Sequence, residues 1–180
     1  PNYEAHRSMT TGVPFDARDV RRAAWWSLLV SPPAGLTYGV HGVWSWETRH
    51  VVPMAHVNSG VAPTWREAMH LPGSTSMQHM ATFFRGFDWW NLRPAPELLA
   101  EQPGRTDPRR FIAVARSEDR STIVAYLPEG GPITFAPDTF ASGADARWFD
   151  PATGAFSATF PATASMTAPG PQDFVLFLRR

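Results

Sequence analysis

The sequence contains no cysteine and no lysine. The absence of cysteine excludes disulfide bonds and thiolate chemistry. All sixteen basic side chains are arginine, a bias that fits a high-GC genome and says little about function. Sixteen acidic side chains bring the formal net charge to zero, so the basic footprint that nucleic acid binding needs is missing. No apolar run approaches the roughly 18 residues of a membrane span.

The chain is long enough and apolar enough to fold around a core. It has 180 residues, of which 43% are hydrophobic, which suits one medium domain or two small ones. It begins at Pro1, and no signal-like segment follows. We therefore expect the C-terminal part of a longer protein, with a processed mature chain as the alternative.

Residues 1–93 predict a helix, a strand, a loop and further helix. Asp16 is a good N-cap for a helix that carries the acidic Asp19 in its first turn, and Pro32 and Pro33 stop that helix. A strand is expected at 36–40, followed by a long loop.

Two short helices are expected after that loop. Thr64 and Glu67 form a capping-box pattern that opens the first of them. Pro72 and Gly73 interrupt it, and Ser74 can cap the second helix.

The remainder reads as a linker and a β-rich region. Residues 94–108 are rich in proline and have the composition of a linker, and 109–180 predict a small antiparallel β-sandwich. Turn residues at 129–131 and 150–154 predict hairpin-type turns. The strand candidates are 111–116, 122–128, 132–137, 146–150, 155–160 and 173–179.

The segment LTYGVHGVWSW, residues 36–46, concentrates aromatic side chains around two glycines. Tryptophan faces suit the C–H face of a sugar, while Tyr38 and His41 can hydrogen-bond hydroxyls. Trp44 and Trp46, one residue apart, would point the same way on a strand. The alternative is an aromatic-rich strand that merely packs against neighbouring helices.

Glu4 is a second candidate, at the end of an expected strand beside Tyr3 and His6. A carboxylate with such neighbours can act as nucleophile or acid/base in glycoside hydrolysis, which needs two carboxyl groups across the scissile bond. The alternative is a solvated acidic residue near a chain end.

Several other kinds of site have no support in the sequence. The six histidines show no metal-binding spacing, and neither a glycine-rich phosphate loop nor a nucleophile elbow occurs, so no metal or cofactor is expected. Trp148 and the aromatic pairs at 25–26, 83–84 and 89–90 are expected to serve packing.

Four segments together resemble one family: NYE at the start, TYGVHGVWSW, AMHLPGSTSM and WFDPATG. They resemble the C-terminal part of the apiosidase-like glycoside hydrolases with their appended β-domain, which carries a collagen-binding label. The resemblance spans nearly the whole chain. It implies that 1–93 supply the end of strand seven, helix seven, strand eight and helix eight of a (β/α)8 barrel, and that 109–180 form the β-domain.

The resemblance also implies a function. The expected enzyme is a glycoside hydrolase acting on plant or microbial polysaccharide side chains, through paired carboxylates and with retention. The family pattern near strand seven resembles Glu-Pro-x-Tyr-Glu, and this chain begins at its proline. Glu4 is therefore either the nucleophile or a substrate-binding carboxylate, and the general acid lies outside the chain.

The resemblance places further residues in the substrate site. Substrate contacts are expected from Tyr3, His6, Tyr38, His41, Trp44 and Trp46. The expected partners are a carbohydrate and the remainder of the barrel, from a preceding segment or another chain, in a secreted or periplasmic protein. The alternative is a non-catalytic carbohydrate-binding or accessory β-sandwich module.

Overall fold

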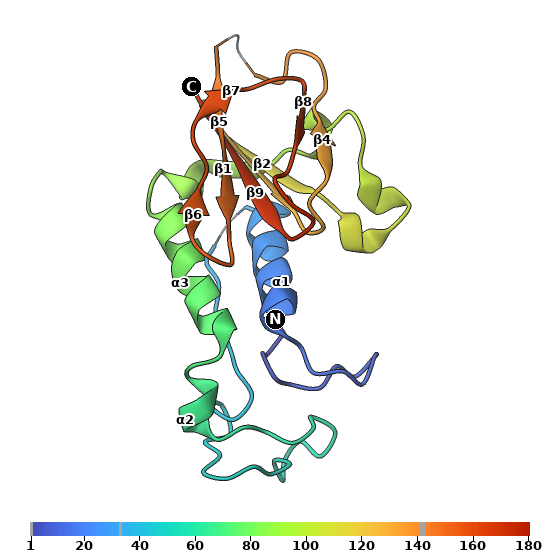
Figure 1. Ribbon diagram of the computed structural model, residues 1–180, viewed down its shortest axis with the longest axis vertical. Coiled ribbons are helices and arrows are strands. Elements are labelled where there is room, and N and C mark those ends of the chain that lie inside the picture. The colour runs from blue at the N-terminus through green and yellow to red at the C-terminus, as the bar shows by residue number, and fades with distance from the viewer. Residues whose placement is uncertain (1, 33, 141–142) are drawn as a thin grey trace.

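The computed structural model describes residues 2–32, 34–140 and 143–180. Figure 1 shows an elongated molecule in which the helices stand below a β-sheet and the loops around α2 form the far end. None of the helices in the described part of the chain has the length and apolar character that a membrane crossing requires.

Helix α1 (Ala17–Leu29) begins as the sequence predicts. The Asp16 side chain accepts a hydrogen bond from the Asp19 backbone N–H at 2.9 Å, and the Asp19 side chain accepts one from the Asp16 N–H at 3.2 Å. This reciprocal cap satisfies two N–H groups that the first turn would otherwise leave without partners.

The strand predicted at 36–40 is wrong as an element, because only one isolated bridge forms there. That bridge is parallel and joins Glu4 to Val40: the Glu4 N–H donates to the Gly39 carbonyl, and the His41 N–H donates to the Glu4 carbonyl. The ladder ends at once because Ala5 turns away with a φ of 62° and residues 41–46 form consecutive turns.

Helix α2 (Trp65–Ala68) opens on the predicted capping box of Thr64 and Glu67. Helix α3 (Pro72–Phe84) begins earlier than predicted, because Pro72 occupies its first turn and Ser74 lies inside it. Proline suits this position, since its fixed φ is already helical and the missing N–H would have had no partner.

The second half of the chain forms two antiparallel sheets. The larger has the strand order β1-β2-β3-β9-β5-β6, with β7 also paired to β5, and the smaller pairs β4 with β8. Each predicted run overlaps a strand, but the run at 155–160 is divided into the short strands β6 and β7, and β1 and β8 were missed. The bounds are β1 Leu92–Pro94, β2 Ala113–Ser117, β3 Thr122–Leu127, β4 Pro132–Thr134, β5 Asp145–Asp150, β6 Ala155–Phe156, β7 Phe160–Pro161, β8 Ser165–Thr167 and β9 Phe174–Arg179.

Two connections differ in detail from the sequence prediction. The segment 94–108, expected as a linker, contains short 3-10 helices and packs Ala95 and Leu98 into the core. The turn at 129–131 is not a hairpin, because it leads from β3 in the larger sheet to β4 in the smaller one. The turn at 150–154 does join the paired strands β5 and β6.

Both faces of the larger sheet are covered, which explains the continuous apolar run of β3. Ile123 and Leu127 pack in a cluster with Ile133 of β4 and Met166 of β8. On the opposite face, Val124 and Tyr126 pack in a cluster with α1 and α3 side chains that include Trp25 and Phe83. Successive side chains on a strand point to opposite faces, so every β3 residue is buried.

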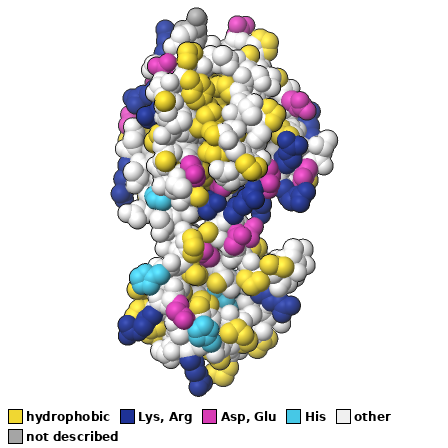
Figure 2. All heavy atoms as spheres, in the orientation of Figure 1, with side chains coloured by type: hydrophobic (Ala, Val, Ile, Leu, Met, Phe, Trp, Pro, Cys, Tyr) yellow, Lys and Arg dark blue, Asp and Glu magenta, His cyan; other side chains and the backbone are white. Residues whose placement is uncertain are grey.

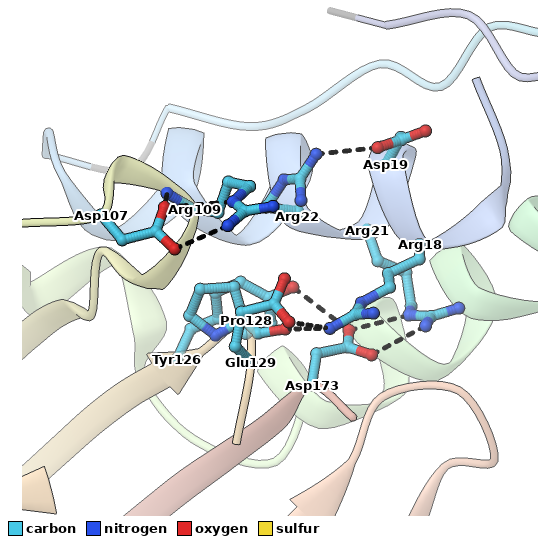
Figure 3. A network of polar contacts seen from close by, with 10 residues as sticks. All are labelled: Arg18, Asp19, Arg21, Arg22, Asp107, Arg109, Tyr126, Pro128, Glu129 and Asp173. Carbon is cyan, nitrogen blue, oxygen red and sulfur yellow. Dashed lines mark hydrogen bonds and ion pairs between the residues drawn. The ribbon is translucent and has the colours of Figure 1, made fainter. Parts of the chain in front are cut away.

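A buried ion pair fixes the helices to the sheet (Figure 3). Arg21 of α1 donates to both carboxylate oxygens of Asp173, at 2.9 and 2.8 Å, and Tyr126 of β3 donates to the same carboxylate at 3.1 Å. Asp173 is fully buried. A bidentate pair with a further donor holds α1 and the sheet in one defined relative position.

Candidate functional site

The Glu4 carboxylate lies buried where three segments meet, with only 3% of the residue exposed. The Tyr38 hydroxyl donates to Glu4 Oε2 at 2.5 Å. The Gly73 N–H donates to Oε2 at 2.9 Å and to Oε1 at 3.1 Å. Residues far apart in the sequence therefore contact one carboxylate, which lies against the N-terminal turn of α3.

Gly73 is what permits this approach. A Cβ atom at this position would lie 2.2 Å from Glu4 Oε2 and 2.9 Å from a methyl of Val20. The first N–H groups of a helix have no intrahelical acceptor, so the carboxylate satisfies one of them at the positive end of the helix dipole. Because glycine has no side chain, the Gly73 N–H can come close enough to donate to the Glu4 carboxylate.

Tyr38 is half-buried beside Glu4, and this environment changes its acidity. Burial first, and then the hydrogen bond to Glu4, raise the pKa of the Tyr38 hydroxyl above its ordinary value of 10.0. Tyr38 therefore stays protonated at neutral pH and keeps donating to the carboxylate.

His41 is completely buried next to the same bridge. Its Nδ1 lies 3.2 Å from the Ala5 carbonyl oxygen, and its buried Nε2 has no hydrogen-bond partner among the described residues. Burial lowers the pKa of His41, so the ring is neutral at pH 7. With Nδ1 donating to the carbonyl, Nε2 is left as an acceptor.

Aromatic rings form a continuous row around His41. His6 lies 5.2 Å from it between centroids, Trp44 stacks on it at 6.0 Å and 13°, and His56 meets Trp44 edge-on at 4.7 Å. Tyr3 extends the row beyond His6 at 6.4 Å. In Figure 2, most of the histidine side chains that are visible lie on the lower part of the molecule.

Trp46 does not belong to this row. It stacks on Trp65 at 4.6 Å and 10°, and the Arg66 guanidinium lies 4.4 Å from the Trp65 ring centre. The prediction that Trp44 and Trp46 point the same way is wrong, because residues 41–46 form turns instead of a strand and Trp46 has a φ of 54°. Trp46 is 63% exposed and Trp44 39%, so each offers an open ring surface.

The structure thus brings six of the predicted residues into one region: Glu4, Tyr38, His41, Tyr3, His6 and Trp44. Sequence reasoning missed Gly73, His56 and Trp65 as contacts. A signal for Gly73 exists, since a Pro-Gly pair that opens a helix leaves N–H groups free for an anion. His56 and Trp65 carry no comparable signal.

Metal binding finds no support in the described residues, where no cluster of three or more histidine, aspartate and glutamate side chains could hold an ion. The chemical groups in the region around Glu4 are its buried carboxylate, a tyrosine hydroxyl, a neutral imidazole and exposed aromatic rings.

Comparison with known proteins places this arrangement in a family. The family described as "Apiosidase-like, catalytic domain" matches residues 1–91, and the one described as "Putative collagen-binding domain of a collagenase" matches residues 94–178. No curated protein matches the sequence.

Solved structures share the fold. One, described as a glycoside hydrolase, aligns with a TM-score of 0.77 at 19% identity over 98% of this chain and 40% of its own. A glycoside hydrolase family 5 protein from Bacteroides vulgatus ATCC 8482 aligns with a TM-score of 0.78 at 18% identity over 98% of this chain and 39% of its own. The chain therefore spans about two fifths of the length of these structures.

At such identities the structural likeness establishes a mixed helix and sheet fold with antiparallel sheets. The family match over residues 1–91 carries the assignment further. The chain belongs to the family of apiosidase-like glycoside hydrolases.

Proposed function

We propose that the chain is part of a glycoside hydrolase that cleaves sugars from plant or microbial polysaccharide side chains by a paired-carboxylate mechanism. The observation that carries this proposal is the buried Glu4 carboxylate, held by Tyr38 and Gly73 beside a row of aromatic rings, in a segment that matches an apiosidase-like catalytic domain. Retaining and inverting glycosidases both place two carboxyl groups about the scissile bond. The general acid would lie outside this chain, as would the nucleophile with Glu4 in a positioning role.

The parallel bridge between Glu4 and Val40 supports a barrel origin for residues 1–93. Two parallel segments with helix α1 between them form a β-α-β connection, the repeating unit of a (β/α)8 barrel. In such a barrel, active-site groups lie at the carboxyl ends of the strands, where Glu4 and 41–46 would meet. The region from 109 onward would be the accessory β-sandwich, with β4 and β8 facing the larger sheet.

An open apolar groove supports a further barrel segment as partner. The groove measures about 270 Å³ and is lined on α1 and α3 by side chains that include Leu28, Met77 and Phe84. The inner side of a barrel helix packs against strands, so the groove would be covered by barrel elements from a preceding segment or another chain. A secreted or periplasmic location would agree with a polysaccharide substrate.

The geometry favours one role for Glu4 over the other. Both of its oxygens accept hydrogen bonds, and only 3% of the residue is exposed, so an approach to an anomeric carbon is blocked. Glu4 would then fix the position of Tyr38, and the exposed rings of Tyr3, Trp44 and Trp46 would contact the sugar. The half-buried His6 would support the Tyr3 ring, and the buried His41 would support the Trp44 ring.

The test is Glu4→Gln and Glu4→Ala in the full-length protein, assayed on aryl glycosides and branched pectin fragments. With a positioning role, Glu4→Gln lowers kcat by about 10²-fold, because reacting groups shift, and azide does not restore the Glu4→Ala variant. Azide rescue of Glu4→Ala would instead assign Glu4 as the nucleophile. Wild-type activity in both variants would remove Glu4 from the active site. No glycosidase activity in the wild type would favour the non-catalytic binding module.

A further inference from the structure

A cleft of about 540 Å³ opens at the end of α3 that is remote from Glu4. Its walls come from the short helix η1 (Trp89–Asn91), the turn between β2 and β3, and Arg179 of β9. Helix α3 runs from Gly73, which contacts Glu4, to its C-cap Arg85, which lines the cleft. At about 1.5 Å per residue, roughly 18 Å separates the two ends, so the cleft is distinct from the Glu4 site.

The aromatic part of the cleft is exposed, and the backbone that carries it is held by Arg93. Trp90 is 56% exposed and meets Trp89 at 6.2 Å and 75°. Its carbonyl oxygen accepts a hydrogen bond from Arg93 at 2.9 Å, and Arg93 also pairs with Glu118 at 2.6 Å. A large apolar ring that is exposed at the wall of a cleft suits the flat C–H face of a sugar ring.

Polar side chains around this ring are free to bind a ligand. Arg85, Asp88, Asn91 and Arg179 make no side-chain hydrogen bond to any other described residue. Asp119 accepts its hydrogen bonds from Ser117 and Ser121 through Oδ1, and those bonds lower its pKa. Planar amide, carboxylate and guanidinium groups beside an aromatic ring are the usual donors and acceptors for sugar hydroxyls.

A second cleft of about 590 Å³ continues the first, and the two share Asp119, Ser121 and Arg179. The continuation adds Arg116, Arg120 and Arg180. Together the two clefts are lined by five arginines and three aspartates, and one of the arginines, Arg116, is paired with Glu97 at 3.7 Å, which leaves four arginines against three aspartates. The guanidinium group matches a carboxylate with two parallel hydrogen bonds, so an excess of arginine favours an anionic ligand.

We infer that these joined clefts bind an acidic oligosaccharide, a sugar chain that contains uronic acid units. Trp90 stacks against one sugar ring, and Arg179, at the junction of the clefts, pairs with a uronate carboxylate. The binding site lies beyond the proposed hydrolytic function and does not depend on it, because it can be measured without any turnover.

The experiment measures binding of tetragalacturonic acid and of neutral cellotetraose to the full-length protein by titration calorimetry. We expect the acidic tetrasaccharide to bind at least about tenfold more tightly, and high salt to reduce this preference, since salt screens exposed charges. Trp90→Ala lowers the affinity for the acidic ligand by about tenfold, and Arg179→Gln removes the preference for it. Arg105→Gln, an exposed arginine outside both clefts, leaves binding unchanged.

Thermal unfolding checks that the variants are as stable as the wild type. We expect equal stability because Trp90 and Arg179 are exposed. Equal affinity for the two tetrasaccharides would overturn the assignment of an acidic ligand. Unchanged binding in Trp90→Ala and Arg179→Gln, or no binding to the wild-type protein, would overturn the site itself. A Glu4→Gln variant that loses activity and keeps this binding would separate the two proposals.

Discussion

His41 lies in an environment far from the one that its side chain prefers in water. It is fully buried, its Nε2 has no partner among the described residues, and burial lowers its pKa below 6.5. Its neighbours His6 and His56 lower the pKa further, whereas the Ala5 carbonyl and Glu47 act in the opposite direction. The folded protein therefore holds His41 in the neutral form.

This burial predicts a loss of stability in mild acid. The unfolded chain binds a proton on His41 near pH 6.5 and the folded chain only at lower pH, so stability is complete above 6.5 and falls as the pH drops from 6.5 to the folded pKa. Each unit of pKa difference corresponds to about 1.4 kcal/mol. Urea unfolding at pH 7.5 and 5.0 measures the effect.

His41→Asn is the test variant, and His70→Asn is its control because His70 is exposed. His41→Asn should reduce the difference between the two pH values, and His70→Asn should leave it unchanged. An equal pH difference in the wild type and in His41→Asn would contradict the assignment.

The sequence predicts the chemical groups that these residues supply better than it predicts the contacts that they make. Tyr38, His41 and Trp44 stand in one aromatic segment, and in the structure Tyr38 contacts Glu4 while His41 stacks on Trp44. Their individual orientations depend on backbone turns, and the positive φ of Trp46 has no signal in its neighbours. Side-chain alternation fails wherever a strand does not form.

At the scale of elements, the start of α3 depends on how closely its backbone approaches Glu4. Gly73 lies in the first turn of the helix and donates to both carboxylate oxygens. In an open helix, alanine would be more stable than glycine by about 1 kcal/mol. At this position the new Cβ would instead lie 2.2 Å from Glu4 Oε2.

We therefore expect Gly73→Ala to destabilise the protein by about 1–3 kcal/mol, the usual cost of forcing extra atoms into a packed site. Gly86→Ala is the control, because its Cβ would meet only the Phe83 carbonyl, at 3.2 Å. Thermal unfolding measures both variants. A stabilised Gly73→Ala protein would show that Glu4 moves away freely and that the contact is loose.

Elements with strong local signals could be predicted, and those that depend on distant partners could not. The capping residues Asp16 and Thr64 start their helices as expected, because capping is local chemistry. Strand β1 was missed because Leu92–Pro94 contains a proline and gains its ladder only by pairing with β2. The strand predicted at 36–40 did not form, because the segment around Glu4 pairs with it through a single bridge.

At the scale of the whole molecule, the two matched regions share one packed core. Trp25 of α1 is fully buried and stacks on Tyr126 of β3 at 5.8 Å and 9°. Further links are the hydrogen bond from Trp26 to the Phe111 carbonyl and the ion pair of Arg18 with Glu129. Such an interface makes the two regions stabilise each other, which sequence composition alone could not indicate.

The Arg21–Asp173 pair should therefore matter to the stability of both regions at once. Removing one partner of a buried pair costs about 3–5 kcal/mol, because the other charge remains buried without compensation. In the Asp173→Ala variant, Arg21 and the Tyr126 hydroxyl would both lose the carboxylate that accepts their hydrogen bonds. Arg21→Met with Asp173→Leu removes both charges and should recover most of the loss.

Guanidinium unfolding, followed by tryptophan fluorescence and by far-UV circular dichroism, measures this prediction. The two signals should change together in the wild type, because Trp25 and Trp26, two of the eight tryptophans, lie at the interface and the sheet packs directly against them. Asp173→Ala should lower the midpoint and separate the two transitions, as the helices detach before the sheet unfolds. Asp107→Ala is the control, since its pair with Arg109 is exposed, and exposed pairs contribute at most about 1 kcal/mol. An Asp173→Ala protein with a wild-type midpoint would mean that apolar packing around Trp25 alone joins the two regions.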